Sequence, residues 1–268
     1  MKNIIIFFTG QFRTNPLSNN SNVSNKIIES YNKFLFTHEF KQKYNYKIFI
    51  STDDINLDSV INYFGKENIC NIHCDNNNWY LKEINNKILP IDIYLDTYKS
   101  QDCWKDHLQY SNSINQYYKL LDSYNLYENE NLIDCDFILR IRPDIYLKRN
   151  ILDMFNILEN NSNIELVTQW DFISAGRPEI MKYYLNTLNN GYGSFKFNEK
   201  LKNIKNIEEI KYPFYNLIFN DFKVIDEYRW AYAPEIQLFE CLFRYYNDNT
   251  DIINEKIINL LDMMDVVR

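Results

Sequence analysis

The chain has 268 residues, enough for one large α/β domain or two small ones. Its formal net charge of −7 argues against a general nucleic-acid-binding protein, whose binding face is basic, but a local basic pocket is compatible with it. No apolar run approaches the length of a membrane span, and Ile4–Phe8 is too short for a signal-peptide core. The five cysteines are scattered and follow no disulfide or zinc spacing, so we expect free thiols in a cytoplasmic protein.

Short apolar runs alternate with stretches of helical periodicity along the chain. The predicted strands cover residues 3–9, 46–51, 69–73, 137–142 and 164–168. The predicted helices cover residues 23–40, 57–64 (closed by Gly65), 104–124, 151–158 and 234–245, with another beginning at Pro178 and a helical C-terminal tail. This alternation predicts an α/β fold with a mostly parallel central sheet flanked by helices, and we expect one domain over residues 1–268.

The strand at residues 137–142 carries the most informative pattern, because its apolar run ends in charged residues. Strand alternation places Arg140, Arg142 and Asp144 on one face, and Pro143 ends the pairing. Ligands of open α/β sheets bind beyond the carboxyl ends of the strands. Two guanidinium groups and a carboxylate suit a diphosphate, with or without a divalent cation. The alternative is a structural salt bridge at the end of a strand.

The loops after the first two predicted strands hold further candidates. Gly10, Gln11 and Arg13 follow the first strand, where doubly wound folds commonly bind nucleotides. The loop matches neither a dinucleotide fingerprint nor a P-loop, and an ordinary turn remains the alternative. Thr52 and Asp53 follow the second strand, where they could contact a base or a ribose or could cap the next helix.

Two carboxylates late in the chain are candidates for a general base. Asp171 follows the strand at 164–168, next to Trp170, which could stack on a sugar ring or belong to the core. Glu235 opens the helix at 234–245, where a carboxylate is also favoured by the helix dipole. A base must be a carboxylate or histidine within reach of the acceptor, and all three histidines fall early in the chain.

A literal D-x-D sequence, Asp134-Cys135-Asp136, precedes the strand at 137–142 instead of ending it. It therefore belongs to the opposite edge of the predicted sheet from Asp144. We expect a role in the turn or at the exit of the preceding helix rather than in metal binding.

Taken in order, these motifs resemble the WavE-type lipopolysaccharide-synthesis proteins and related GT-A-like glycosyltransferases of bacteria and large DNA viruses. The resemblance covers roughly residues 4–244, and the Arg-x-Arg-Pro-Asp segment is its most specific part. The residues that carry it are Gly10-Gln11-x-Arg13, Ser51-Thr52, Gln109-Tyr110-Ser111, Asp136-Phe137-x-x-x-Arg140-x-Arg142-x-Asp144, Asp171-x-x-x-x-Gly176-x-x-x-x-Met181 and Ala233-Pro234-Glu235.

The resemblance implies a GT-A-like fold, a nucleotide-sugar donor and a glycan hydroxyl as acceptor, with the protein in the cytoplasm, or the host cytoplasm for a viral member. By this analogy Asp144 stands at the last carboxylate of the transferase D-x-D and reaches Mn²⁺ or Mg²⁺ on the diphosphate. The chain departs from that pattern, because Arg142 occupies the first acidic position and no late histidine follows. Arginines could neutralise the leaving diphosphate instead.

In this interpretation, the loop from Gly10 to Arg13 holds the nucleotide with Thr52 and Asp53, and Asp171 or Glu235 serves the acceptor. Two other functions remain open. One is a binding module that retains nucleotide or sugar without turnover, and the other is a nucleotidyltransferase. A nucleotidyltransferase usually needs a glycine-rich, basic phosphate loop after the first strand, and this loop offers only one glycine and one arginine.

Overall fold

The computed structural model describes residues 1–10, 12, 15–19, 25–52, 54–74, 108–130, 134–187, 241–242, 245–247 and 249–266. The predicted helix at 234–245 lies largely outside these residues. None of the described helices has the length and apolar character needed to span a membrane.

A seven-stranded sheet in the order β3-β2-β1-β4-β7-β6-β8 forms the centre of the structure. Its strands are β1 (Lys2–Thr9), β2 (Tyr44–Thr52), β3 (Ile69–Cys74), β4 (Phe137–Ile141), β6 (Leu166–Gln169), β7 (Ile173–Gly176) and β8 (Ile257–Asn259). All neighbours pair in parallel except β7, which is antiparallel to both β4 and β6. The apolar runs of β1 and β4 are almost entirely buried, as expected of strands covered on both faces. The predicted α/β fold with a mostly parallel sheet is therefore confirmed.

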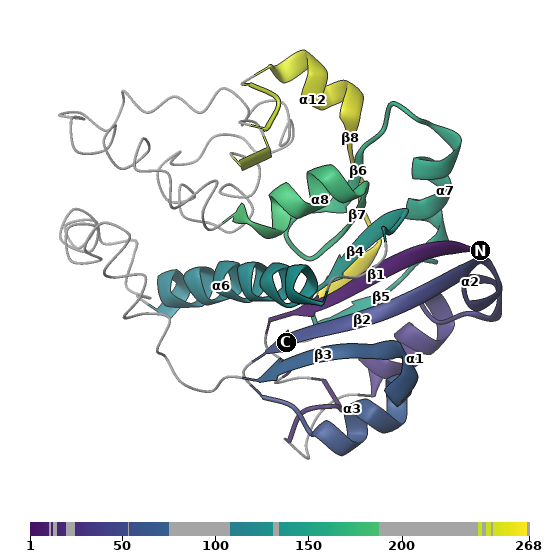
Figure 1. Cartoon of the computed structure of the whole chain (residues 1–268), viewed down its shortest axis with the longest axis vertical. Coiled ribbons are helices and arrows are strands. Elements are labelled where there is room, and N and C mark those ends of the chain that lie inside the picture. Colours follow the sequence, from purple (N-terminus) through teal and green to yellow (C-terminus); the bar gives the residue numbers. More distant parts are fainter. Residues whose placement is uncertain are drawn as a thin grey trace, which may run out of the picture.

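Helices cover both faces of the sheet (Figure 1). They are α1 (Lys26–Phe34), α2 (His38–Lys43), α3 (Leu57–Phe64), α6 (Leu108–Asn129), α7 (Leu152–Asn160), α8 (Pro178–Leu185) and α12 (Thr250–Lys256). Tyr127 of α6 packs against the rings of Phe7 and Phe49, so α6 lies on the face of the odd-numbered β1 residues. Tyr31 of α1 packs against Phe8, so α1 lies on the other face, where α2, α3 and α7 contribute to the same apolar core.

Several elements differ from their predicted form. The single helix expected at 23–40 is two helices, because Thr37 is extended and its hydroxyl accepts a hydrogen bond from the Phe40 amide, which starts α2. The tail expected to be helical contains α12 but then forms two strands, β8 and β9 (Met264–Val266). β9 pairs with β5 (Ile145–Leu147), a strand that the sequence did not reveal, and β7 was also missed.

The order of the strands creates a switch point between β1 and β4. From β1 the chain proceeds to β2 and β3 on one side, and β4 then joins on the other side. In such sheets the crevice at the carboxyl ends, where the order reverses, is the usual ligand site. The loops that follow β1 and β4 therefore border this crevice.

Candidate active site

The loops after β1 and β4 are joined at the switch point. Gly10 has a φ of 124°, which L side chains rarely adopt, and its amide donates to the carbonyl of Ser51 at 3.0 Å. A Cβ on Gly10 would lie 3.5 Å from Cδ of Pro143, so the two loops are in van der Waals contact. Asn15 Nδ2 donates to the Pro143 carbonyl at 2.9 Å. Backbone geometry and a side chain thus hold the two loops together.

Arg140 is completely buried at this junction. Its Nε donates to Thr9 Oγ1, at the end of β1, over 2.8 Å. Its Nη1 and Nη2 atoms have no hydrogen-bond partner within the described part of the chain. Burying a charge without partners is costly, and buried polar groups in folded proteins are nearly always paired. Arg140 therefore has hydrogen-bonding capacity that the described residues leave unused.

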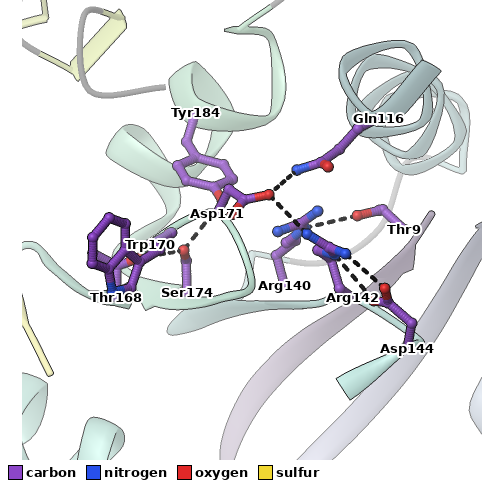
Figure 2. Close-up of polar contacts among 10 residues, drawn as sticks. All are labelled: Thr9, Gln116, Arg140, Arg142, Asp144, Thr168, Trp170, Asp171, Ser174 and Tyr184. Atoms are coloured by element: carbon purple, nitrogen blue, oxygen red, sulfur yellow. Dashed lines mark hydrogen bonds and ion pairs between the residues drawn. The ribbon is translucent and has the colours of Figure 1, made fainter. Parts of the chain in front are cut away.

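Arg142, by contrast, is paired with two carboxylates. Its Nε and Nη2 donate to the two oxygens of Asp144 at 3.0 and 2.6 Å, and Nη1 donates to Asp171 Oδ2 at 3.1 Å (Figure 2). Its guanidinium carbon lies 4.6 Å from the centre of the Phe172 ring. Burial alone would lower the pKa of Arg142, but the charges of Asp171 and Asp144 outweigh it and raise the pKa. Arg142 thus acts as a fixed bridge between the two carboxylates.

Asp171 lies in the turn between β6 and β7, with only 1% of its surface exposed. Its Oδ2 atom accepts from Arg142 and also from Gln116 Nε2 of α6, at 2.5 Å. Its Oδ1 atom is buried and has no hydrogen-bond partner among the residues described. The preceding residue, Trp170, has a φ of 54°, which is strained for a bulky side chain. A strained turn therefore holds a buried carboxylate with one oxygen bonded and the other without a partner among the described residues.

A chain of buried hydroxyls runs from this turn toward Arg140. Thr168 Oγ1 and Ser174 Oγ lie 2.7 Å apart, and Ser174 Oγ donates to the Tyr184 hydroxyl at 3.2 Å (Figure 2). Burial raises the pKa of Tyr184, while the nearby charge of Arg140 counteracts part of that rise. The chain thus ends at Tyr184, whose neutral hydroxyl lies close to the Arg140 guanidinium.

The structure brings together five of the predicted site residues. They are Gly10, Arg140, Arg142, Asp144 and Asp171, all at the carboxyl ends of β1 and β4 or in the turn beside them. Gln11, Arg13, Asp53 and Glu235 lie outside the described residues.

Thr52 is also at this edge of the sheet and is fully buried. Its carbonyl accepts from Lys119 Nζ at 2.7 Å. The alternative prediction, that the Thr52 segment caps the following helix, is wrong, because α3 begins after Asn56, whose side chain accepts from the Ser59 amide at 2.9 Å.

The D-x-D sequence before β4 lies at the other edge of the sheet, as predicted. Asp136 Oδ2 accepts from the amide of Asn3, near the start of β1, at 2.7 Å. It therefore fastens the amino ends of two adjacent strands.

Helix α6 supplies residues that the sequence did not single out. Gln116 contacts Asp171, and Lys119, which is 1% exposed, contacts the end of β2. The polar residues at 116, 119 and 122 recur every three positions, so they share one face of a helix. A polar face usually predicts exposure to solvent, which is why these residues were not identified as part of the site.

The divalent cation that the resemblance implies does not fit the described residues. Both oxygens of Asp144 are hydrogen-bonded to Arg142, and a cation would have to bind beside that guanidinium. Within the described ranges, no three His, Cys, Asp or Glu side chains are grouped so that they could share a metal ion.

No protein-family model and no curated protein matches the sequence. Among solved structures, the chain is similar to mouse xyloside xylosyltransferase 1, with a TM-score of 0.41 and 8% identity over 97% of this chain and 84% of that one. It is also similar to the galactosyltransferase LgtC in complex with donor and acceptor sugar analogues, with a TM-score of 0.39 and 10% identity over 98% and 86% of the two chains. A third similar structure is the glycosyltransferase GlyE of Streptococcus pneumoniae TIGR4, with a TM-score of 0.33 and 13% identity over 82% and 44%. At these TM-scores and identities, the similarities say nothing about the function of this chain.

Proposed function

We propose that the chain is a GT-A-like glycosyltransferase that moves a sugar from a nucleotide-diphosphate-sugar donor to a hydroxyl of a glycan acceptor. One observation carries the proposal. A buried guanidinium with two unpartnered nitrogens (Arg140) and a buried carboxylate with one unpartnered oxygen (Asp171) belong to the same polar site at the switch point (Figure 2). Direct displacement of a diphosphate by a hydroxyl uses both groups, a positive charge for the leaving group and a base for the attacking hydroxyl.

Arg140 is the proposed binding group for the donor diphosphate. The planar guanidinium matches pairs of phosphate oxygens, and the hydrogen bond to Thr9 fixes its orientation. The anion would satisfy the two nitrogens that lack partners in the described structure. Gly10, Gln11 and Arg13 would then hold the nucleotide end of the donor, with Thr52 and Asp53 beside them.

Asp171 is the proposed base for the acceptor, with Glu235 as the second candidate. Arg142 and Gln116 hold Oδ2 of Asp171, which leaves Oδ1 to take the proton of the acceptor hydroxyl. The acceptor oxygen then bonds to the anomeric carbon of the sugar, while the bond from that carbon to the diphosphate breaks. The nucleoside diphosphate leaves with its new charge next to Arg140. Asp144 keeps Arg142 in place for this step.

The test is a release assay with a panel of nucleotide sugars, with and without a glycan acceptor, in Mn²⁺ and in EDTA. We expect release of a nucleoside diphosphate, and we expect the Asp171→Asn variant to bind the donor but lose about 10²- to 10⁴-fold in kcat. Donor binding without release would instead identify a non-catalytic binding module. Release of pyrophosphate would identify a nucleotidyltransferase.

A further inference from the structure

An aspartate on α6 holds a histidine and a serine at the ends of two neighbouring strands. Asp122 Oδ2 lies 2.7 Å from His73 Nδ1, at the end of β3, and accepts from Ser51 Oγ, near the end of β2, at 2.5 Å. The Asp122 side chain is 13% exposed and the His73 side chain 37% exposed. Asp122 on α6 thus holds the imidazole ring of His73, and part of that ring faces solvent.

This contact fixes the tautomer of the imidazole ring. A carboxylate only accepts hydrogen bonds, so the proton of a neutral His73 must sit on Nδ1, and Nε2 is left as an acceptor. Among the described residues, none forms a hydrogen bond with Nε2. An acceptor held in a fixed direction without a partner suits a ligand that offers a hydroxyl or an N–H group.

The position of His73 relative to the proposed diphosphate site indicates which ligand that is. His73 is in register with Ser51, which is in register with Thr9, the residue that orients Arg140. Neighbouring strands lie about 4.8 Å apart, so His73 is about 10 Å from Thr9 along the same edge of the sheet. A nucleoside attached to a diphosphate extends over a comparable length. In doubly wound folds, the nucleoside likewise lies across the carboxyl ends of the first strands.

We propose that His73 binds the nucleoside portion of the donor, with Nε2 accepting from a ribose hydroxyl or from an N–H group of the base. Asp122 is a positioning residue that orients the ring, and Ser51 supports Asp122. This inference rests on the proposed function, because it takes the diphosphate to lie at Arg140. It adds a specificity residue from β3, which belongs to none of the elements that carry Arg140 and Asp171.

The test measures binding of UDP, GDP, ADP, CDP and inorganic pyrophosphate by calorimetry, in the wild type and in His73→Ala. We expect His73→Ala to weaken the preferred nucleoside diphosphate at least tenfold and to leave pyrophosphate binding unchanged, because pyrophosphate lacks a nucleoside. His73→Gln should recover part of the loss, since the amide oxygen can accept the same hydrogen bond, and Asp122→Asn should lose part of the affinity. His38→Ala is the matched control, because His38 is exposed on α2, before the amino end of β2.

The 2′-deoxy and 3′-deoxy forms of the preferred ligand show which group donates the hydrogen bond to His73 Nε2, a ribose hydroxyl or an N–H of the base. If His73 contacts the ribose, one deoxy form binds the wild type at least tenfold more weakly, and His73→Ala no longer distinguishes it from the parent ligand. If His73 contacts the base, both deoxy forms bind the wild type as the parent does, and His73→Ala loses its preference among the four bases.

Two results would overturn the inference alone. One is unchanged nucleoside diphosphate affinity in His73→Ala, and the other is an equal loss for pyrophosphate, which would make His73 a phosphate contact or a structural residue. If the wild type binds none of the four nucleoside diphosphates, the proposed function itself fails and the inference falls with it.

Discussion

Arg140 of β4 donates a hydrogen bond from Nε to Thr9 Oγ1 at the end of β1, over 2.8 Å, and so links the two strands on either side of the switch point. The same guanidinium leaves two buried nitrogens without a partner in the described chain. A fold that only needed to join β1 to β4 would do so at lower cost with an apolar side chain. The arrangement is instead what a site for an anion requires, a cation that is oriented in advance and has nitrogens left to donate.

Replacing Arg140 with methionine should therefore separate stability from function. Methionine fills a similar volume without a charge, so we expect the free energy of unfolding to rise by about 1–3 kcal/mol. Binding of pyrophosphate and of nucleoside diphosphates should be lost. Urea denaturation and calorimetry measure the two effects on the same preparation.

Thr9→Val is the matched control for that variant, because it removes the hydroxyl that orients the guanidinium and keeps the charge. We expect the affinity for pyrophosphate and nucleoside diphosphates to fall about tenfold, since the loss of one hydrogen bond corresponds to about 1.5 kcal/mol. An Arg140→Met protein that is less stable and still binds pyrophosphate would contradict the assignment.

Asp144 should be required for transfer but not for folding. Its side chain is 21% exposed, and its carboxylate is held by two hydrogen bonds from Arg142. In Asp144→Ala, Arg142 loses that support and can leave Asp171 Oδ2, which disturbs the proposed base. We expect kcat to fall at least about 10²-fold, with a loss of stability of about 1 kcal/mol. Donor binding should persist, because Arg140 is untouched, and turnover equal to that of the wild type would refute the role of Asp144.

The sequence predicted the strands of the site because their signal is local. The apolar run of β4 predicts a buried strand by itself, and Pro143 marks its end, so the position of Arg140 near the ligand edge followed from a single stretch of residues. The end of β1 and the glycine after it could be predicted in the same way. The φ of 124° at Gly10 gives the physical reason for the glycine.

The partners of these residues could not be predicted, because they depend on the packing of distant segments. Asp171 reaches Arg142 because the four-residue strand β7 inserts antiparallel between β4 and β6, and a run that short has no distinctive periodicity. Gln116 reaches Asp171 because α6 turns polar residues toward the sheet, whereas a helix normally packs its apolar face against the core. β8 and β9, three residues each, become strands only by pairing with β6 and β5.

The strained backbone at Trp170 should matter for the placement of Asp171. Asparagine tolerates a positive φ, whereas a β-branched valine strongly resists it, and both variants remove the indole ring. We expect Trp170→Val to be less stable than Trp170→Asn by about 1–2 kcal/mol and to have the lower kcat, since it forces the turn away from the geometry that presents Asp171. Thermal unfolding and the release assay check the comparison. Equal stability and equal kcat in the two variants would show that the turn does not depend on this conformation.

Glu159 of α7 should make the stability of the fold depend on pH at the edge of the sheet away from the site. Its carboxylate accepts from Tyr44 at 2.9 Å and pairs with Lys43 at 2.6 Å and Lys2 at 3.2 Å, at the amino ends of β1 and β2. Burial alone would raise the pKa of Glu159, but these partners outweigh it and lower the pKa below its ordinary value of 4.5.

A carboxyl with a lower pKa in the folded state contributes its full stability above about pH 4.5, and the contribution is lost as the pH falls through the folded value. We therefore expect Glu159→Gln to be less stable than the wild type by about 1 kcal/mol at pH 7, with the difference shrinking as the pH falls below about 4.5 in urea unfolding curves. Asp153→Asn, on the same helix with a side chain that is 45% exposed, should show no such difference, and a Glu159→Gln deficit that did not shrink with falling pH would mean that packing rather than charge holds this corner.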